Sequence, residues 1–326
     1  MKRFNSKHLV VFVCLTYFAL LFSCQKKSPQ QEVGNPSGAP EKVDHDMPDP
    51  ANEDQNMDIP DSQLLNFTHD HFIQKHQKTS LKWHEKTHDQ YVYWCAKKLG
   101  LSEERAQAMG EAAEMPDFFQ AGIQNGFAQQ WSHAYMYSSK GNWEWGDADD
   151  DFHDNLLGSE TPGKEGEGYK GKYAGLYYDQ GDQKMGDWYV GYGLHYITDV
   201  SETLHSTFIF PKVSMAFHHF DFESWVLNNW TEGHCFVNAV KDVDPSEFYQ
   251  VSDLRASLKQ AAYNANYYSS SFSGKAWDAY GDSGYPKGVG EGNAEAVKYT
   301  KVMIHEAAKW TGGSMKFILQ HYNQLN

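Results

Sequence analysis

Apolar residues recur with helical spacing along most of the chain after residue 79. Residues 79–99 place apolar side chains on one helical face, and Gly100 follows as a natural C-cap. Ser102 is a suitable N-cap for the next helix, which we expect to run to Ala113. The same spacing predicts further helices over 118–137, 187–206, 214–230, 253–268 and 293–325, the last interrupted at Gly312–Gly313. Alternation typical of strands is scarce, so the sequence predicts an all-α fold, a multi-helix bundle with long surface loops.

Two stretches rich in glycine and polar residues separate these helices. Residues 138–186 combine Gly, Asp and Tyr, and we expect a long loop there. Asp147, Asp149 and Asp151 alternate within it as calcium ligands do, but the Gly and Glu positions of an EF-hand loop do not fit. We therefore expect a solvated acidic loop. Residues 273–292 are the second predicted surface loop.

The first 23 residues have the pattern of a secretion signal, with basic residues ahead of an apolar run. The run ends at Leu21-Phe22-Ser23-Cys24, which resembles the lipobox of bacterial lipoproteins, where the Cys becomes the acylated N-terminus. The alternative is an ordinary signal peptide followed by a chance cysteine. The resemblance implies an exported lipoprotein, held at a membrane by lipid on Cys24. Because Gln25 follows, it also implies the outer membrane if the cell is Gram-negative, and otherwise the cell surface.

Residues 24–61 are expected to form an acidic tether between this anchor and the folded domain. They include six prolines and no Trp, Tyr or Phe, so they cannot bury enough apolar surface to offset their conformational entropy. Residues 62–326 then make up one domain, a size that a single hydrophobic core supports.

The composition narrows the functional classes. A net charge of −15 argues against generic electrostatic binding to nucleic acid or anionic lipid, which needs a surplus of Lys and Arg. Aromatic residues make up 15% of the chain, enough for a sizeable core. Cys95 and Cys235 are the cysteines of the folded domain, and the sequence allows either a disulfide or two buried thiols.

Histidines and carboxylates repeat at helical spacing between residues 195 and 223. His195-Tyr-Ile-Thr-Asp199 places a His and an Asp four residues apart, on one face of a helix. His205 follows, and His219-Phe-Asp-Phe-Glu223 repeats the spacing. Imidazole and carboxylate groups are zinc ligands, and helical pairs of this kind can present both to one ion. These five side chains therefore predict a zinc centre.

Three further candidate ligands, His88, Asp117 and His133, precede this region. Together with them, the intervals between residues 195 and 223 resemble those of the zinc-dependent bacterial phospholipases C. The resemblance covers most of residues 80–326, and the same superfamily includes the S1/P1-type single-strand nucleases. It implies that residues 62–326 form an all-α bundle like that of phospholipase C and P1 nuclease. It further implies metal-assisted phosphodiester hydrolysis with two or three Zn²⁺ ions.

The same resemblance assigns each candidate a role. It implies three zinc positions, held by Asp117, His133, His195 and Asp199, by His205, His219 and Glu223, and by His88 with a bridging Asp199. Asp117 is also the candidate catalytic residue, either as a base or as the group that orients the attacking water.

The N-terminal side of the expected site departs from the family. There the mature chain begins at a Trp whose free amine binds zinc, whereas Trp83 lies far from the expected acylated N-terminus. Trp83 has no free amine unless a protease cuts before it. His84 is a candidate replacement, and His69 is among other histidines that could serve. Without such a ligand the site holds two zinc ions.

These observations favour a phospholipase C that releases a phosphorylated head group from a phospholipid, with no obligate protein partner evident. The short gap between His205 and His219 and the Glu at 223 resemble that branch, whereas Trp83 resembles the start of the nucleases. An S1/P1-like single-strand nuclease or 3′-nucleotidase acting on nucleic acid is the alternative, and a non-catalytic zinc-binding lipoprotein is the third. The candidate substrate contacts are Tyr135, Tyr137 and Trp143.

Overall fold

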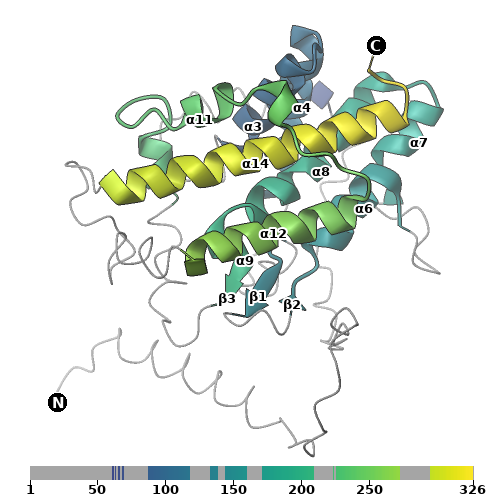
Figure 1. The fold of residues 1–326 in the computed structure, drawn as a ribbon. Helices are drawn as coiled ribbons and strands as arrows, with labels where there is room; N and C mark the ends of the chain where they lie inside the picture. The colour runs from purple at the N-terminus through teal and green to yellow at the C-terminus, as the bar shows by residue number, and fades with distance from the viewer. Residues whose placement is uncertain are drawn as a thin grey trace, which may run out of the picture. The chain divides into compact units, whose positions relative to one another are not determined.

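The computed structural model describes residues 61, 63, 65, 66, 68, 69, 87–117, 133–138, 144–159, 171–208, 223, 225–271 and 294–325. Within these residues the predicted all-α fold is confirmed (Figure 1). The helices are α3 (His88–Lys98), α4 (Glu103–Ala113), α6 (Ala148–Leu157), α7 (Ala174–Asp179), α8 (Gln183–Val200), α9 (Thr203–Ser206), α11 (Val237–Lys241), α12 (Leu254–Ser271) and α14 (Ala294–His321), with a 3-10 turn at Pro245–Glu247. The strands are short: β1 (Met136–Ser138), β2 (Glu144–Trp145) and β3 (Thr207–Phe208). None of the described helices is both long and apolar enough to cross a membrane.

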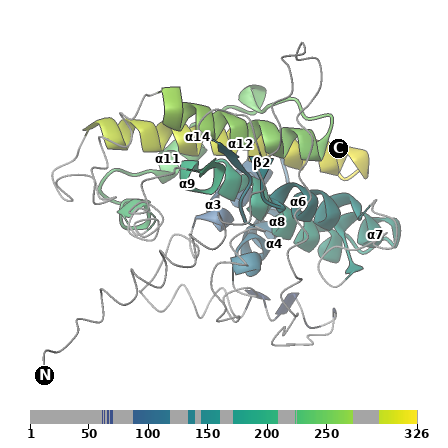
Figure 2. The ribbon, with the colours of Figure 1, turned by 90° about the horizontal axis from the view of Figure 1, so that it is seen from below.

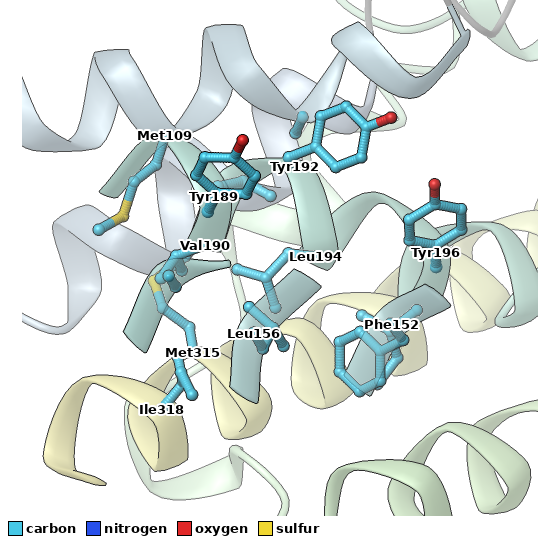
Figure 3. Packing of buried hydrophobic residues seen from close by; sticks show 14 of the residues in the cluster. Met109, Phe152, Leu156, Tyr189, Val190, Tyr192, Leu194, Tyr196, Met315 and Ile318 are labelled. Atoms are coloured by element: carbon cyan, nitrogen blue, oxygen red, sulfur yellow. The ribbon is translucent and has the colours of Figure 1, made fainter. Parts of the chain in front are cut away.

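Helix α8 lies at the centre of this arrangement. Every residue from Met185 to Val200 is buried, which is the pattern of a helix enclosed on all sides. Helices α4, α6, α7, α12 and α14 all pack against it, and α12 and α14 lie side by side in both views (Figures 1 and 2). Figure 3 shows Val190 and Leu194 of α8 next to Leu156 of α6 and Met315 of α14. The functional candidates on α8 are therefore held in the core of the protein.

A glycine sets the distance between α8 and α4. A Cβ atom on Gly191 would lie 2.1 Å from the main-chain oxygen of Met109, so only a glycine fits at this contact. One turn further along both helices, Nδ1 of His195 lies 2.8 Å from the main-chain oxygen of Ala113. The close approach of the two helices thus brings His195 within hydrogen-bonding reach of α4.

A small sheet connects residues 133–138 to the end of α9. Strand β1 pairs antiparallel with β2 and parallel with β3. The amide of Tyr135 donates a hydrogen bond of 3.2 Å to the main-chain oxygen of His205. The predicted helix over 118–137 is therefore wrong at its end, because pairing with a remote strand supplies these backbone hydrogen bonds instead. Residues 118–132 lie outside the described part of the chain.

The predicted loop over 138–186 is also wrong, since it contains α6, α7 and the start of α8. Helix α6 begins with three consecutive aspartates at 149–151, and acidic side chains are stabilising at the positive end of a helix dipole. Asp149 is buried, with its carboxylate 3.1 Å from Nζ of Lys259 on α12, so the segment is not a solvated acidic loop. The second predicted loop, 273–292, lies outside the described residues.

Helix α14 runs through Gly312–Gly313, where the sequence predicted an interruption. A Cβ atom on Gly312 would lie 2.4 Å from the ring of Phe248, and one on Gly313 would lie 2.2 Å from the main-chain oxygen of Tyr249. The two glycines therefore serve close packing between α14 and the segment after the 3-10 turn, and they do not end the helix.

Other helix ends agree with the sequence more closely. The hydroxyl of Ser102 accepts from the amide of Arg105 at the start of α4, and Gly100 follows α3 with a φ of +83°. The predicted helix over 187–206, in contrast, is divided into α8 and α9 by a turn at residues 201–202. The hydroxyl of Ser201 donates to the main-chain oxygen of Ile197 at 2.6 Å and closes the last turn of α8.

The described residues before α3 are attached to the helices. The carboxylate of Asp61 lies 2.5 Å from Nζ of Lys172, and Nε1 of Trp188 donates to the hydroxyl of Thr68 at 2.9 Å. Residues 1–60, which include the predicted signal peptide, the lipidation site Cys24 and nearly all of the tether, lie outside the described part.

The two cysteines of the folded domain are free thiols. Cys95 is buried in α3, with its thiol donating to the main-chain oxygen of Ala308, and burial raises its pKa to about 12. Cys235 is partly exposed. Of the two alternatives left by the sequence, the structure therefore has separate thiols.

Candidate metal centre

Three groups of histidine and carboxylate side chains lie close together around the C-terminal half of α8. The ligand atoms within each group all lie within 4.8 Å of one another, and two of the groups share His195. The groups consist of His88, His195 and Asp199, of Asp117, His133 and His195, and of Glu202, His205 and Glu223. Each group could hold a metal ion, and all of the residues but Asp117 are buried.

Helix α8 supplies the two side chains at the centre of the cluster. His195 and Asp199 are four residues apart on one helical face, with Nε2 of His195 3.0 Å from Oδ2 of Asp199. The other oxygen of Asp199, Oδ1, lies 3.3 Å from Nε2 of His88 on α3. Asp199 thus faces two histidines with two different oxygens, as a carboxylate that bridges two metal positions does.

His133 and Asp117 complete this part of the cluster from outside α8. Nδ1 of His133 lies 2.6 Å from Oδ2 of Asp199 and 2.8 Å from Nε2 of His195. Asp117 follows α4, with Oδ1 at 3.6 Å from Nε2 of His195 and 3.8 Å from Nδ1 of His133. Four ligand atoms from three separate segments of the chain therefore converge on one point.

Three of the histidines are oriented through Nδ1 by a hydrogen bond that leaves Nε2 facing the carboxylates. Nδ1 of His195 is bonded to the main-chain oxygen of Ala113, and Nδ1 of His205 is bonded to that of His133. Nδ1 of His88 is bonded to the hydroxyl of Thr198, which itself donates to the main-chain oxygen of His195 at 2.6 Å. Carbonyl acceptors require the proton on Nδ1, so Nε2 presents a lone pair in the neutral ring.

Glu202, His205 and Glu223 form a second position beside the first. Nε2 of His205 lies 3.5 Å from Oε2 of Glu202 and 3.7 Å from Oε1 of Glu223. Glu202 was not among the predicted ligands, although its spacing from His205, three residues along the chain, is that of neighbours on a helix. The predicted partner His219 lies outside the described residues.

The charges of the cluster shift the pKa values of its members. Burial opposes charge on His195, but Asp199 and Asp117 outweigh it and raise the pKa of that imidazole. Burial likewise opposes charge on Asp199, yet the nearby histidines hold the pKa of its carboxyl well below the usual range. For His133 burial prevails, and its pKa is lowered. The cluster therefore keeps Asp199 ionised and His133 neutral, the forms that bind metal.

The donor set and its geometry fit zinc. Two ligand atoms at about 2.0–2.2 Å from a tetrahedral zinc ion are about 3.3–3.6 Å apart. The separations of 3.3 Å and 3.6 Å between Nε2 of a histidine and a carboxylate oxygen lie in this range. The 3.0 Å between His195 and Asp199 is shorter, and the 2.6 Å and 2.8 Å contacts of His133 are hydrogen-bond distances. The hydrogen bonds from Nδ1 are the outer-shell contacts that metal-binding histidines use.

Seven of the predicted ligands lie in these groups, namely His88, Asp117, His133, His195, Asp199, His205 and Glu223. Their proximity is a structural result, whereas their role as ligands stays a prediction. The other candidates, His84, Trp83, His219 and Trp143, lie outside the described residues.

Three further candidate site residues are described by the structure but are not members of the three groups. His69 is bonded through Nδ1 to the carboxylate of Glu111, at 2.8 Å. Tyr135 is buried, and Nζ of Lys259 lies 5.2 Å from the centre of its ring, a packing position in the core. The structure describes Tyr137 only through its backbone in β1.

Comparison with known protein families and with curated proteins finds no match for this chain. The three groups of buried histidine and carboxylate residues therefore stand as the features from which a function is to be inferred.

Proposed function

We propose that this protein is a zinc-dependent phosphodiester hydrolase of the phospholipase C type. The observation that supports the proposal is the convergence of His88, Asp117, His133, His195 and Asp199 next to Glu202, His205 and Glu223. A buried cluster of this size is more than one structural zinc ion needs, because four ligands complete such a site.

The charge of the cluster suits an anionic substrate. Its four carboxylates, from Asp117, Asp199, Glu202 and Glu223, balance two divalent cations. A third cation would leave the centre positive and attract a phosphodiester and a hydroxide. When bound, zinc ions would supply Lewis-acid activation of the phosphoryl group and lower the pKa of water.

The exposure of the side chains indicates where the substrate enters. The Asp117 side chain is 12% exposed and that of His133 is 10%, whereas those of His195 and Asp199 are 0–1% exposed. Asp117 is therefore the carboxylate at the open side of the cluster, where it can accept a proton from the attacking water or orient it. Asp199 and His195 are fully enclosed, and their role would be to hold the metal.

Three features favour a phospholipid over a nucleic acid as substrate. The Glu at 223, in place of the Asp usual in the nucleases, resembles the phospholipase branch. The net charge of −15 disfavours long polyanions, and the predicted lipid at Cys24 would hold the protein at a membrane.

The test offers both substrates to the zinc-loaded full chain, solubilised in detergent. Phosphatidylcholine vesicles and single-stranded DNA are incubated with it in parallel, and diacylglycerol and DNA fragments are measured. We expect diacylglycerol release with intact DNA. Cleaved DNA with intact lipid would assign the chain to the nuclease alternative. If neither substrate is cleaved, both the phospholipase proposal and the nuclease alternative are overturned.

The matched variants are Asp199→Asn and Asp182→Asn. Asp199→Asn removes the bridging carboxylate, so we expect at least a 1,000-fold loss of activity, roughly 4 kcal/mol, together with loss of bound zinc. Asp182 is the N-cap of α8 outside the cluster, and Asn caps helices equally well, so Asp182→Asn keeps full activity. An active Asp199→Asn protein would contradict the assignment.

A further inference from the structure

We infer that Glu202 is a direct metal ligand. Together with Glu223 it makes a carboxylate-rich metal position, and the preference of this position for zinc over manganese is weaker than that of the histidine-rich positions around His195. This deepens the proposed function, since the position belongs to the same centre. Glu202 faces His205 across 3.5 Å and is 4% exposed, so its carboxylate is directed into the protein.

The backbone holds Glu202 rigidly in this orientation. Its amide donates to the main-chain oxygen of Asp199 at 2.8 Å, and its own carbonyl accepts from the amide of His205 at 3.1 Å. The hydroxyl of Ser206 donates to the same carbonyl at 3.1 Å. The turn between α8 and α9 is thus one hydrogen-bonded unit that carries Asp199, Glu202 and His205.

The break between the helices explains how this unit serves two positions. On a continuous helix, residues six apart are rotated by about 240°, so His205 would turn away from Asp199. The turn at residues 201–202 ends that rotation, and the backbone hydrogen bonds of residue 202 connect it to both Asp199 and His205. Glu202 occupies the turn itself, between the shared carboxylate and the histidine.

The second carboxylate, Glu223, favours a cation between the two glutamates. Glu223 is 0% exposed, with Oε1 3.7 Å from Nε2 of His205, and the ligand atoms of the group lie within 4.8 Å. Two ionised carboxylates at this separation repel each other strongly in a buried environment. A divalent cation between them converts that repulsion into attraction for both.

The donor set determines which cation is accepted. Carboxylate oxygens suit Mn²⁺, Mg²⁺ and Ca²⁺, whereas imidazole suits Zn²⁺. The histidine-rich positions around His195 combine three imidazoles with two carboxylates. The described members of the Glu202 group are two carboxylates and one imidazole, and the predicted ligand His219 would add a second imidazole, so carboxylates make up a larger share of this group in either case. Zinc still binds more tightly than manganese at either, and the margin is smaller at the Glu202 position.

The experiment measures metal binding without a substrate. Metal-free full chain receives zinc until the tighter positions are filled, and Mn²⁺ is then titrated while free and bound Mn²⁺ are measured by electron paramagnetic resonance. We expect the native chain to bind Mn²⁺ at one position, and Glu202→Gln to bind it at least about 100-fold more weakly, more than loss of an outer-shell contact costs.

The control is Glu111→Gln, which alters a buried glutamate of α4 that is bonded to His69 outside the cluster. It should bind Mn²⁺ as the native chain does. A second variant, Glu202→Asp, keeps the charge and shortens the side chain by one methylene, so it remains informative if Glu202→Gln fails to fold. We expect at least a tenfold loss from it, because the shorter carboxylate cannot reach the ion.

Native-like Mn²⁺ binding by a folded Glu202→Gln or Glu202→Asp chain would overturn the inference. Because no substrate is present, this result leaves the proposed hydrolase function standing. Conversely, the native chain could hydrolyse neither lipid nor DNA while substitution of Glu202 still weakens Mn²⁺ binding. The inferred metal position would then stand, and the proposed hydrolase function would be overturned.

Discussion

Nε2 of His195 and Oδ2 of Asp199 lie 3.0 Å apart, one turn from each other on the buried helix α8. Each shifts the pKa of the other toward the charged form, against the effect of burial. In the metal-free protein they act as an ion pair at mildly acidic pH, and the same geometry serves metal binding once His195 has lost its proton.

This pair predicts how the stability of the metal-free chain depends on pH. The lowered pKa of Asp199 gives a contribution present above about pH 4 and lost as the pH falls through that lowered pKa. The raised pKa of His195 gives a contribution present below about pH 6.5 and lost as the pH rises through that raised pKa. The pair therefore stabilises most between about pH 4 and 6.5.

Asp199→Asn should accordingly cost more stability at pH 5.5 than at pH 9, by urea unfolding of the metal-free chain. Removing one partner of a buried ion pair costs about 3–5 kcal/mol, and at pH 9 we expect a smaller loss. An equal loss at both pH values would show that the charge of His195 in the folded state does not change between pH 5.5 and pH 9.

The second prediction concerns Thr198, whose hydroxyl we expect to affect zinc affinity rather than stability. Its hydroxyl accepts from Nδ1 of His88 and donates to the main-chain oxygen of His195, so it fixes which nitrogen of His88 faces the cluster. Thr198→Val removes the acceptor. We expect zinc at the His88 position to bind about 10–100-fold more weakly, measured by competition with a chelator.

The serine variant and a matched valine variant separate this role from packing. Thr198→Ser keeps the hydroxyl and should restore zinc affinity. Thr311 is a buried threonine of α14 whose hydroxyl donates to the main-chain oxygen of Ala307, so Thr311→Val makes the same change away from the cluster. If Thr311→Val weakens zinc binding as much as Thr198→Val, the hydroxyl of Thr198 does not position His88.

The helices could be predicted where burial alone fixes the pattern. Helix α4 and its Ser102 cap, and the course of α12, follow from apolar spacing and capping chemistry. The strand at residues 136–138 could not be predicted, because its partner is a two-residue strand some seventy positions later. The glycines at 312–313 were misinterpreted because a close contact with a remote segment and a helix break both favour glycine.

Only the contacts of the candidate site that depend on spacing within one helix could be predicted from the sequence. His195 and Asp199 are four apart on one helix, so their proximity follows from helix geometry. The positions of His88, Asp117 and His133 depend on how distant segments pack around α8, and only the resemblance suggested them. Glu202 was missed because its position depends on the turn that ends α8.

The packing role of Gly313 is itself testable. A Cβ atom there would lie 2.2 Å from the main-chain oxygen of Tyr249, and a backbone atom cannot yield as a side chain can. Gly313→Ala should therefore destabilise the protein by about 1–3 kcal/mol, despite the better helix propensity of alanine. Lys316→Ala, at an exposed position one turn later, should be neutral in the same thermal melt. A Gly313→Ala protein as stable as Lys316→Ala would show that the glycine serves another purpose.

Asp151 predicts a stability change of the opposite pH sense from that of Asp199. Burial, then the charges of Asp147 and its acidic neighbours, raises the pKa of the Asp151 carboxyl to about 8. A raised carboxyl pKa means that the folded chain binds the proton more tightly than the unfolded chain, so stability falls as the pH rises from about 4 through 8. Asp151→Asn keeps the neutral form, and we expect it to gain roughly 1–3 kcal/mol relative to the native chain between pH 5 and pH 9.

Urea unfolding at the two pH values measures this gain, with Asp179→Asn, an exposed aspartate at the end of α7, as the control. The control should show no such pH-dependent difference, because the carboxylate it removes faces solvent. If Asp151→Asn and Asp179→Asn respond alike, Asp151 is already ionised at pH 5 in the folded protein. The acidic first turn of α6 would then be stabilised as three carboxylates at the positive end of the helix dipole, with Lys259 offsetting the charge of Asp149.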